Sequence, residues 1–376
     1  FQYHSDNAET SAGYYEYYSL IDQVNRILPH IGNVTGGNTD RKNELTAQLL
    51  GLRALGHFGL LQSFCGNYNP SGLGVPVMTE ATVGDITGKP ARNSMAEVMT
   101  QIETDIANAK SLFPETTAGN FSDTVLNKLN LTAFQARISL YKGDYDAAIN
   151  YASEVINSGL VALASGTDYQ NIWQDLSYSE SLFRVRLLQS SALGGQYTGP
   201  GFSAIIAPSD KLTNAYDAAD IRLATFIGTT PAGHRYVKKH GSSSRGPSIV
   251  DVKACRLSEM YLIRSEAYAK KSAPDIASGA ADLNTLRSNR IFGYVNENFG
   301  SAAALADAVI EERFKELCFE GFRFYDLKRN NLPVQRAASD ASPAWETLPA
   351  GSPLFVYPIP LDAIKANPNL VQNPGY

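Results

Sequence analysis

Residues 309–329 carry the run VIEERFKELCFEGFRFYDLKR, and the chain closes at 367–376 with NPNLVQNPGY. The apolar residues in the first half of the run repeat at helical spacing, at Ile310, Phe314, Leu317 and Cys318. This spacing predicts an amphipathic helix with one face packed against the protein, and Gly321 suits its C-terminal cap. Charged residues three or four positions apart predict local ion pairs, namely Glu311–Lys315, Arg313–Glu316 and Glu320–Arg323.

The same two segments resemble the SusD/RagB family of Bacteroidetes. The resemblance rests on E-R-x-x-E-L-x-F-E-G-x-R-x-x-D-L-x-R within 312–329 and on N-P-x-L-x-Q-N-P-G-Y at the end of the chain. Weaker similarity extends forward to about residue 45, through 52–54, 209–222 and 256–267, so it covers most of the sequence. Members of this family are cell-surface nutrient-binding lipoproteins. The resemblance therefore implies binding, and it implies that the signature stabilises the fold.

Helical periodicity dominates the chain. It predicts helices over 45–64 and from Ser94, where Ser94-Met-Ala-Glu97 reads as a capping box. Residues 126–158 read as a helical hairpin that turns at Gly143 and resembles a tetratricopeptide repeat. A second candidate pair begins at Arg256. The predicted fold is mainly α, a tetratricopeptide-like helical repeat scaffold with a loop-rich insertion and minor β structure.

We expect one SusD-like domain over residues 1–376. Its helical scaffold would occupy about 1–158 and 254–329, and a loop-rich ligand-binding insertion would occupy about 160–253. Residues 181–188 alternate in part like a strand, and Gly, Ser and Pro interrupt the stretches around them. Residues 330–376 read as an extended C-terminal segment. Long ordered loops on a rigid frame commonly carry binding residues.

Composition excludes several classes of protein. The 376 residues are 44% hydrophobic and 18% charged, with a net charge of −5 and no local Lys/Arg cluster, so nothing favours nucleic acid as a partner. Three widely spaced cysteines, Cys65, Cys255 and Cys318, predict buried structural thiols. No apolar run is long enough to span a membrane. The resemblance implies an outer-membrane, surface-exposed lipoprotein whose N-terminal lipid anchor is absent from this chain.

The sequence carries no recognisable catalytic motif. The five histidines have no zinc-site spacing, and no nucleophile elbow, Walker loop or dinucleotide fingerprint is present. Three acids, Glu312, Glu316 and Glu320, share one helical face, and a glycosidase needs a pair of acids. Nearby cations favour structural ion pairing instead. We therefore predict no catalytic residue, no metal site and no cofactor.

Aromatic residues provide the positive signal for binding. The chain has 20 Tyr against 2 Trp, and several aromatics lie beside amides in the irregular segments. A flat ring can desolvate the C–H face of a sugar while neighbouring polar groups pair with its hydroxyls. This reasoning predicts a ligand site made of Asn67, Tyr68, Trp173, Gln196, Tyr197 and Phe202.

By resemblance, the chain would bind an oligosaccharide and deliver it to a SusC-like TonB-dependent transporter. Two alternatives remain open at this stage. A peptide-binding SusD/RagB relative would have the same fold, and the low Trp count is compatible with it. A helical-repeat adaptor for partner proteins would instead use a concave helical surface, with no part for the insertion.

Overall fold

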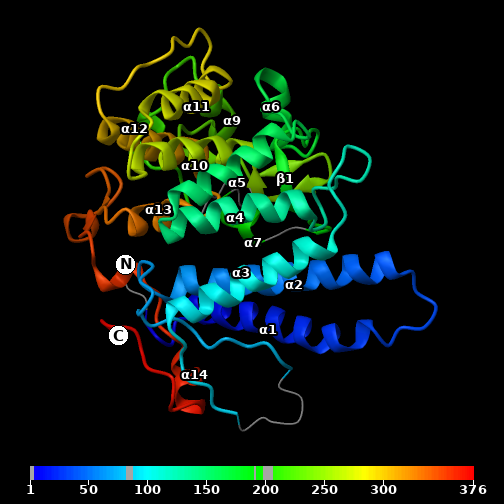
Figure 1. Cartoon of the computed structure of the whole chain (residues 1–376). Coiled ribbons are helices and arrows are strands. Elements are labelled where there is room, and N and C mark those ends of the chain that lie inside the picture. Colours follow the sequence, from blue (N-terminus) through cyan, green and yellow to red (C-terminus); the bar gives the residue numbers. More distant parts are fainter. Residues whose placement is uncertain (1–3, 82–87, 190–191, 198–205) are drawn as a thin grey trace.

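The computed structural model describes residues 4–81, 88–189, 192–197 and 206–376 (Figure 1). The helices of the described residues are α1 (Ala8–Ile31), α2 (Thr39–Phe64), α3 (Met95–Leu112), α4 (Lys128–Lys142), α5 (Tyr145–Asn157), α6 (Gly166–Ile172), α7 (Ala192–Tyr197), α8 (Asp210–Asn214), α9 (Ile221–Phe226), α10 (Leu257–Lys270), α11 (Ile276–Ser288), α12 (Ala302–Glu316), α13 (Arg323–Arg329) and α14 (Leu361–Ala366). The strands are β1 (Ser181–Val185), β2 (Ile227–Thr229), β3 (Arg235–Val237), β4 (Ser242–Ser243), β5 (Gly246–Pro247), β6 (Val252–Arg256), β7 (Val334–Gln335) and β8 (Thr347–Leu348). The predicted mainly α class is confirmed.

The predicted scaffold helices form where the sequence places them. The helix expected over 45–64 is the greater part of α2. At the start of α3, the Ser94 N–H donates to the Glu97 carboxylate at 2.7 Å, which completes the predicted capping box. The hairpin expected over 126–158 is α4 and α5, joined at Gly143, whose φ of +80° glycine adopts without strain. The second pair is α10 and α11.

Each scaffold helix packs against the next. α1 contacts α2, α2 contacts α3, α3 contacts α4 and α4 contacts α5, while α10 contacts α5, α11 and α12. In Figure 1, α1 to α3 form the lower half of the molecule and α4, α5 and α10 to α12 the upper half. One apolar core includes residues from Tyr14 in α1 to Ala267 in α10, together with Ile359 and Leu370 of the C-terminal segment. Close approach requires small residues, since a Cβ on Gly59 would lie 2.4 Å from the Tyr17 ring.

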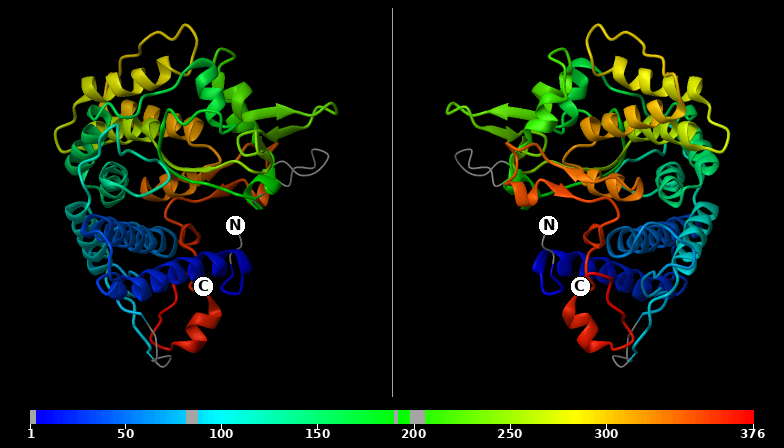
Figure 2. Two further views of the ribbon diagram at one scale, coloured as in Figure 1. Left: turned by 90° about the vertical axis from the view of Figure 1, so that its right-hand side faces the viewer. Right: turned by 90° about the vertical axis from the view of Figure 1, so that its left-hand side faces the viewer.

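Residues 160–253 contain short elements. β1 pairs antiparallel with β6, with Ser181 opposite Arg256 and Val185 opposite Val252, and this pairing joins the segment to the start of α10. β2 and β3 form a hairpin that projects from the body of the molecule (Figure 2). α6 to α9 are helices of five to seven residues that the sequence did not predict. Such short helices carry too few turns to produce a periodic apolar pattern.

The signature run forms two helices instead of one capped at Gly321. α12 ends at Glu316, and the chain then turns through Phe319 at φ +63° and Gly321 at φ +87° into α13. Gly321 therefore serves the turn between the two helices, five residues beyond the end of α12. The turn lets α12 and α13 contact each other as separate elements.

The predicted local ion pairs of this run are wrong. Glu320 pairs with Lys239 at 2.7 Å and with Arg256 at 2.8 Å, and Arg323 pairs with Glu311 at 3.4 Å. Arg313 pairs with Asp326 of α13 and not with Glu316, and the Lys315 ammonium contacts Glu312 instead of Glu311. Ion pairing between residues three or four positions apart describes the exposed face of a helix. Here the inner face of α12 is buried, and its acids are reached by cations from other elements as well as by Lys315 of the same helix.

Glu316 is the centre of this buried charge network. Its carboxylate lies 3.1 Å from Arg222 of α9, 2.9 Å from Arg256 at the end of β6 and 3.0 Å from Arg290 after α11, and none of these side chains is more than 1% exposed. Burial alone raises the pKa of a carboxyl group, but here Arg290, Arg256 and Arg222 outweigh it and hold the pKa of Glu316 well below its ordinary value. One carboxylate thus joins residues 160–253 to the scaffold.

Both signature motifs meet at the C-terminal end of α2. The Lys328 ammonium donates to the carbonyl oxygens of Gln62 at 2.7 Å and Cys65 at 2.6 Å, and the Asn373 amide donates to the carbonyl of Phe64 at 2.9 Å. The last carbonyls of a helix have no partner within the helix and carry its negative dipole end. Burial lowers the pKa of Lys328 to about 8. Residues far apart in sequence therefore cap one helix.

The C-terminal segment returns to the start of the chain. The Leu361 N–H at the start of α14 donates to the Ser5 carbonyl at 2.7 Å, so the C-terminal segment lies against the residues just before α1. Cys65, Cys255 and Cys318 are free and buried, as predicted. Across the described residues, none of the helices combines the length and the apolar character needed to cross a membrane.

Glu316→Gln should destabilise the fold strongly. The substitution keeps the shape of the side chain but leaves three buried arginines short of one negative charge, which should cost about 3 to 5 kcal/mol of unfolding free energy. Urea denaturation followed by circular dichroism measures this loss. The matched control is Glu311→Gln, because the Glu311 side chain is 55% exposed and its pair with Arg323 should contribute less than about 1 kcal/mol. Equal losses in both variants would contradict the assigned role.

Stability should also fall with acid. The pKa of Glu312 falls from 4.5 to about 2, because Arg222, Lys315 and Arg287 outweigh the opposite effect of burial. A depressed folded-state pKa contributes stability above the unfolded value, and that contribution is lost as pH falls. The urea midpoint should therefore drop between about pH 5 and pH 2, and the drop should be smaller in Glu312→Gln. A midpoint unchanged from pH 7 to pH 3 would contradict the prediction.

Candidate functional site

A cleft of about 720 Å³ lies where residues 160–253 meet α12, α13 and the C-terminal segment. We call it the insertion cleft. Its lining comes from three stretches, namely 206–209 with Lys211, the α12 and α13 residues Phe314, Arg323 and Leu327, and 334–336 with Ser339 and Asp340. The volume falls within the range of about 300 to 1,000 Å³ that is usual for small-molecule sites.

Hydrogen bonds join opposite walls of the insertion cleft. The Asp340 carboxylate accepts from the backbone N–H of Asp210 at 2.8 Å and of Lys211 at 3.4 Å. The Lys211 ammonium donates to the Gln335 carbonyl at 3.4 Å. These bonds hold the start of α8 against the strand β7, although the two lie more than a hundred residues apart in sequence. The cleft is therefore a preformed feature of the fold.

The side chains of the insertion cleft combine apolar and polar chemistry. Phe314 and Leu327 supply apolar surface, and the Arg323 guanidinium lies 4.4 Å from the centre of the Phe314 ring. Hydroxyl and amide groups come from Ser209, Ser339 and Gln335. A ring beside hydrogen-bonding groups is the arrangement that recognises a ligand with one apolar face and a polar rim.

Two of the predicted ligand residues lie beside this cleft. Gln196 and Tyr197 end α7, and the Gln196 carbonyl accepts from the N–H of Ile206, a cleft residue, at 3.0 Å. The Tyr197 ring is half-buried, with its centre 5.5 Å from that of Phe319 and 5.7 Å from that of His240. Burial raises the pKa of Tyr197. The sequence placed both residues in a loop, whereas they belong to a short helix.

Trp173 has a different environment from the one expected. It directly follows α6, its side chain is only 2% exposed, and its ring packs edge-on against Phe226. The Lys239 ammonium lies 4.2 Å from the centre of the ring. Trp173 therefore belongs to the core, and its ring has no face open to a ligand. Phe202 lies outside the described residues.

Asn67 and Tyr68 lie on the other side of α13. They line a recess of about 20 Å³ together with Tyr325 and Lys328, and the Asn67 amide donates to the Lys328 carbonyl at 2.8 Å. A space of this size holds about one water molecule and no sugar ring. Because α13 separates this recess from the insertion cleft, the predicted site residues do not gather at one place.

The cleft residues on α12 and in the C-terminal segment were missed by sequence reasoning. Phe314 was assigned to the buried apolar stripe, and 334–340 fell in a segment described only as extended. The available signal was the SusD-like similarity over 209–222, which includes Ser209 and Lys211 of the cleft lining. A cleft made of distant stretches leaves no spacing that a sequence pattern can detect.

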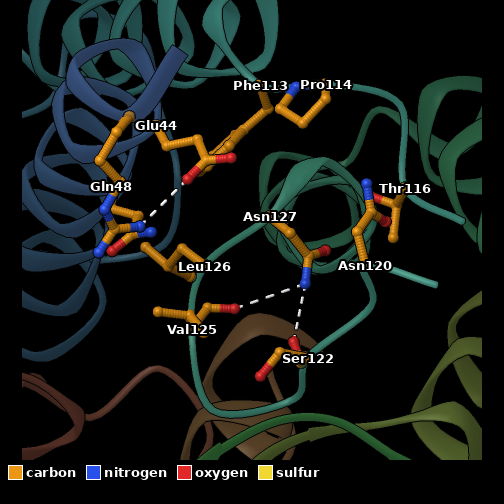
Figure 3. A pocket seen from close by; sticks show the side chains of 11 residues that line it. Glu44, Gln48, Phe113, Pro114, Thr116, Asn120, Ser122, Val125, Leu126 and Asn127 are labelled. Carbon is orange, nitrogen blue, oxygen red and sulfur yellow. Dashed lines mark hydrogen bonds and ion pairs between the residues drawn. The ribbon is translucent and has the colours of Figure 1, made fainter. Parts of the chain in front are cut away.

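A second hollow, of about 220 Å³, lies between α2 and the connection from α3 to α4 (Figure 3). Arg41 pairs with Glu44 at 3.1 Å there, and the Asn127 amide donates to the Ser122 carbonyl at 2.8 Å. Asn127 also caps α4. The volume of this hollow is below the range of about 300 to 1,000 Å³ that is usual for small-molecule sites, so we regard the insertion cleft as the stronger candidate. Within the described ranges, no three His, Cys, Asp or Glu side chains gather as a metal site would require.

Two family models match the chain. One, described as "SusD family", matches residues 211–376, and one described as "Starch-binding associating with outer membrane" matches residues 1–140. Among curated relatives, SusD-like protein P2 of Formosa agariphila is 26% identical over 99% of this chain and 81% of its own length. SusD-like protein P38 of the same organism is 24% identical over 85% of this chain and 72% of its own length.

Solved structures share the whole fold. A SusD superfamily protein from Bacteroides thetaiotaomicron superposes with a TM-score of 0.85 at 28% identity, covering 95% of this chain and 84% of that one. A putative sugar binding protein from Bacteroides vulgatus superposes with a TM-score of 0.87 at 28% identity, covering 99% and 86%. The two family models together match both ends of the sequence, and the helical architecture superposes on that of a SusD superfamily structure. The chain therefore belongs to the SusD/RagB family.

Proposed function

We propose that this chain captures an oligosaccharide in the insertion cleft and delivers it to a SusC-like TonB-dependent transporter of the outer membrane. The observation that carries the proposal is the cleft itself, which is preformed, about 720 Å³ in volume and lined by an aromatic ring beside hydroxyl and amide groups. The sugar-binding description of the Bacteroides vulgatus structure and the starch-binding description of the matched family model support the same ligand class.

The proposed site keeps two of the residues predicted from sequence. Gln196 and Tyr197 would border the ligand, and Phe314 would cover the apolar face of a sugar ring. Asn67 and Tyr68 would remain outside the main site, in the recess behind α13. In this proposal residues 160–253 act as the ligand-binding insertion of a single domain.

We assign binding and no covalent chemistry to the chain. Glycoside hydrolysis needs two carboxyl groups that reach the glycosidic bond from a cleft. Glu312 and Glu316 are the acids with suitable helical spacing, yet both are fully buried and paired with arginines. Delivery to a transporter would need the chain at the cell surface, held to the outer membrane by a lipid anchor.

Blocking the insertion cleft should abolish capture. Ser339 is exposed and lines the cleft, so Ser339→Trp should fold normally and fill space that a sugar ring would occupy. We expect glycan affinity to fall at least tenfold, measured by isothermal titration calorimetry with the polysaccharide that binds best from a panel of plant, fungal, algal and host glycans. Ser339→Ala is the matched control and should keep its affinity. Unchanged affinity in Ser339→Trp would exclude the cleft as the site.

Aromatic variants should distinguish the two sides of α13. Tyr197→Ala should weaken binding about fivefold to thirtyfold, because burying one ring face against a sugar contributes roughly 1 to 2 kcal/mol. Tyr68→Ala should change affinity less than twofold, since its recess is too small for a sugar ring. The reverse order of effects, measured by the same calorimetry, would move the site to the Tyr68 recess.

A further inference from the structure

We infer that residues 335–347 form a lid over the insertion cleft, and that the Asp340 carboxylate is the latch that holds this lid closed. The inference rests on the proposed function and adds the control of ligand entry and release at the same site. It starts from a difference within the cleft lining. One part of the lining lies on the scaffold helices α12 and α13, whereas Ser339 and Asp340 lie in the connection between the short strands β7 and β8.

The two ends of the lid are anchored on the scaffold. Val334 of β7 pairs with Leu348 of β8, so the strands form the base of a hairpin. Leu348 is 4% exposed and belongs to a small apolar cluster with Leu327 of α13 and Phe355, against which Val334 packs. The base of the hairpin is therefore fixed next to the cleft.

The lid itself lies at the surface. Every residue from 335 to 347 is exposed or half-buried, and Trp345 near its end is 41% exposed. A segment with few buried apolar contacts opens locally at a lower free energy than the whole protein unfolds. The lid should therefore be able to swing away from the cleft while its base and the helices stay folded.

The latch reaches the opposite wall of the cleft. The Asp340 carboxylate accepts the N–H groups of Asp210 at 2.8 Å and of Lys211 at 3.4 Å, and these are the first two residues of α8. The first N–H groups of a helix have no acceptor within the helix. Asp340 therefore supplies acceptors to α8 from a distant part of the sequence, and the same two bonds tie the lid down.

A latched lid has consequences for the rates of binding. With the lid open, a stretch of a polysaccharide could enter the cleft from the side, and closing the lid would hold its rings against Phe314. Entry and release would then both depend on how often the Asp340 bonds break. A residue that only adds affinity acts differently, because the loss of its contacts changes the dissociation rate most.

Hydrogen exchange tests the latch without any ligand. The amides of Asp210 and Lys211 can exchange with solvent only when their bonds to Asp340 break, so they report the opening of the lid. We expect both amides to exchange at least tenfold faster in Asp340→Ala than in the wild type, measured by mass spectrometry with residue-level fragmentation. The amides of α12 should be unchanged, which shows that the variant is folded. Equal exchange in the two proteins would overturn the latch.

Binding kinetics test the control of entry and release. Biolayer interferometry on an immobilised oligosaccharide, cut from the polysaccharide that binds best, gives the association and dissociation rate constants. Both should rise at least threefold in Asp340→Ala, and Asp340→Asn, which keeps one acceptor oxygen, should give intermediate values. The matched control is Asp362→Asn, which removes an equal charge from α14, outside the cleft lining, and should change neither rate.

The outcomes separate the lid from the proposed function. A faster dissociation with an unchanged association rate would make Asp340 an affinity residue and overturn the lid. Unchanged rates in Asp340→Ala, with binding still blocked by Ser339→Trp, would overturn the lid and leave glycan capture standing. A chain that binds none of the glycans would overturn capture and the control of entry together, while hydrogen exchange at Asp210 and Lys211 would still decide the latch.

Discussion

The fold depends on neutralising one buried carboxylate. Glu316 is fully buried, and an isolated charge there would cost several kcal/mol. Arg222, Arg256 and Arg290 surround it, and each comes from a different part of the chain. Because these arginines are themselves buried, moving any one of them away would leave unpaired charge in the interior of the protein. Residues 160–253 are thereby held against α12, and this placement forms one wall of the insertion cleft.

The two segments that carry the family motifs form hydrogen bonds to the end of α2. Lys328, at a variable position within the first motif, and Asn373, a fixed position of the second, both donate to carbonyls at the end of α2. α2 has no basic residue in its own last turn, so these groups supply what a local cap would otherwise provide. The motif joins the N-terminal helices, α13 and the C-terminal segment at one junction. Its residues stabilise the frame, while the proposed ligand site uses neighbouring positions.

Sequence reasoning succeeded where the physics is local. Helical periodicity, the capping box at Ser94 and the turn at Gly143 predicted α2 to α5 and the second hairpin. It failed for the partners of Glu320, because pairing at i+3 or i+4 assumes an exposed face. It also failed for Trp173, since an aromatic residue outside a periodic stretch can still pack in the core. The insertion cleft could not be predicted at all, because 206–211 and 334–340 meet only in the folded chain.

The most direct test is a crystal structure of the chain with an oligosaccharide cut from the polysaccharide that it binds. We predict that the sugar rings occupy the insertion cleft, with one ring against Phe314 and its substituents within hydrogen-bond distance of Ser209, Gln335 or Ser339. The charge network around Glu316 should be unchanged, since it positions the walls and does not contact the ligand. Sugar bound in the recess at Tyr68, or in the hollow between α2 and the connection to α4, would contradict this assignment.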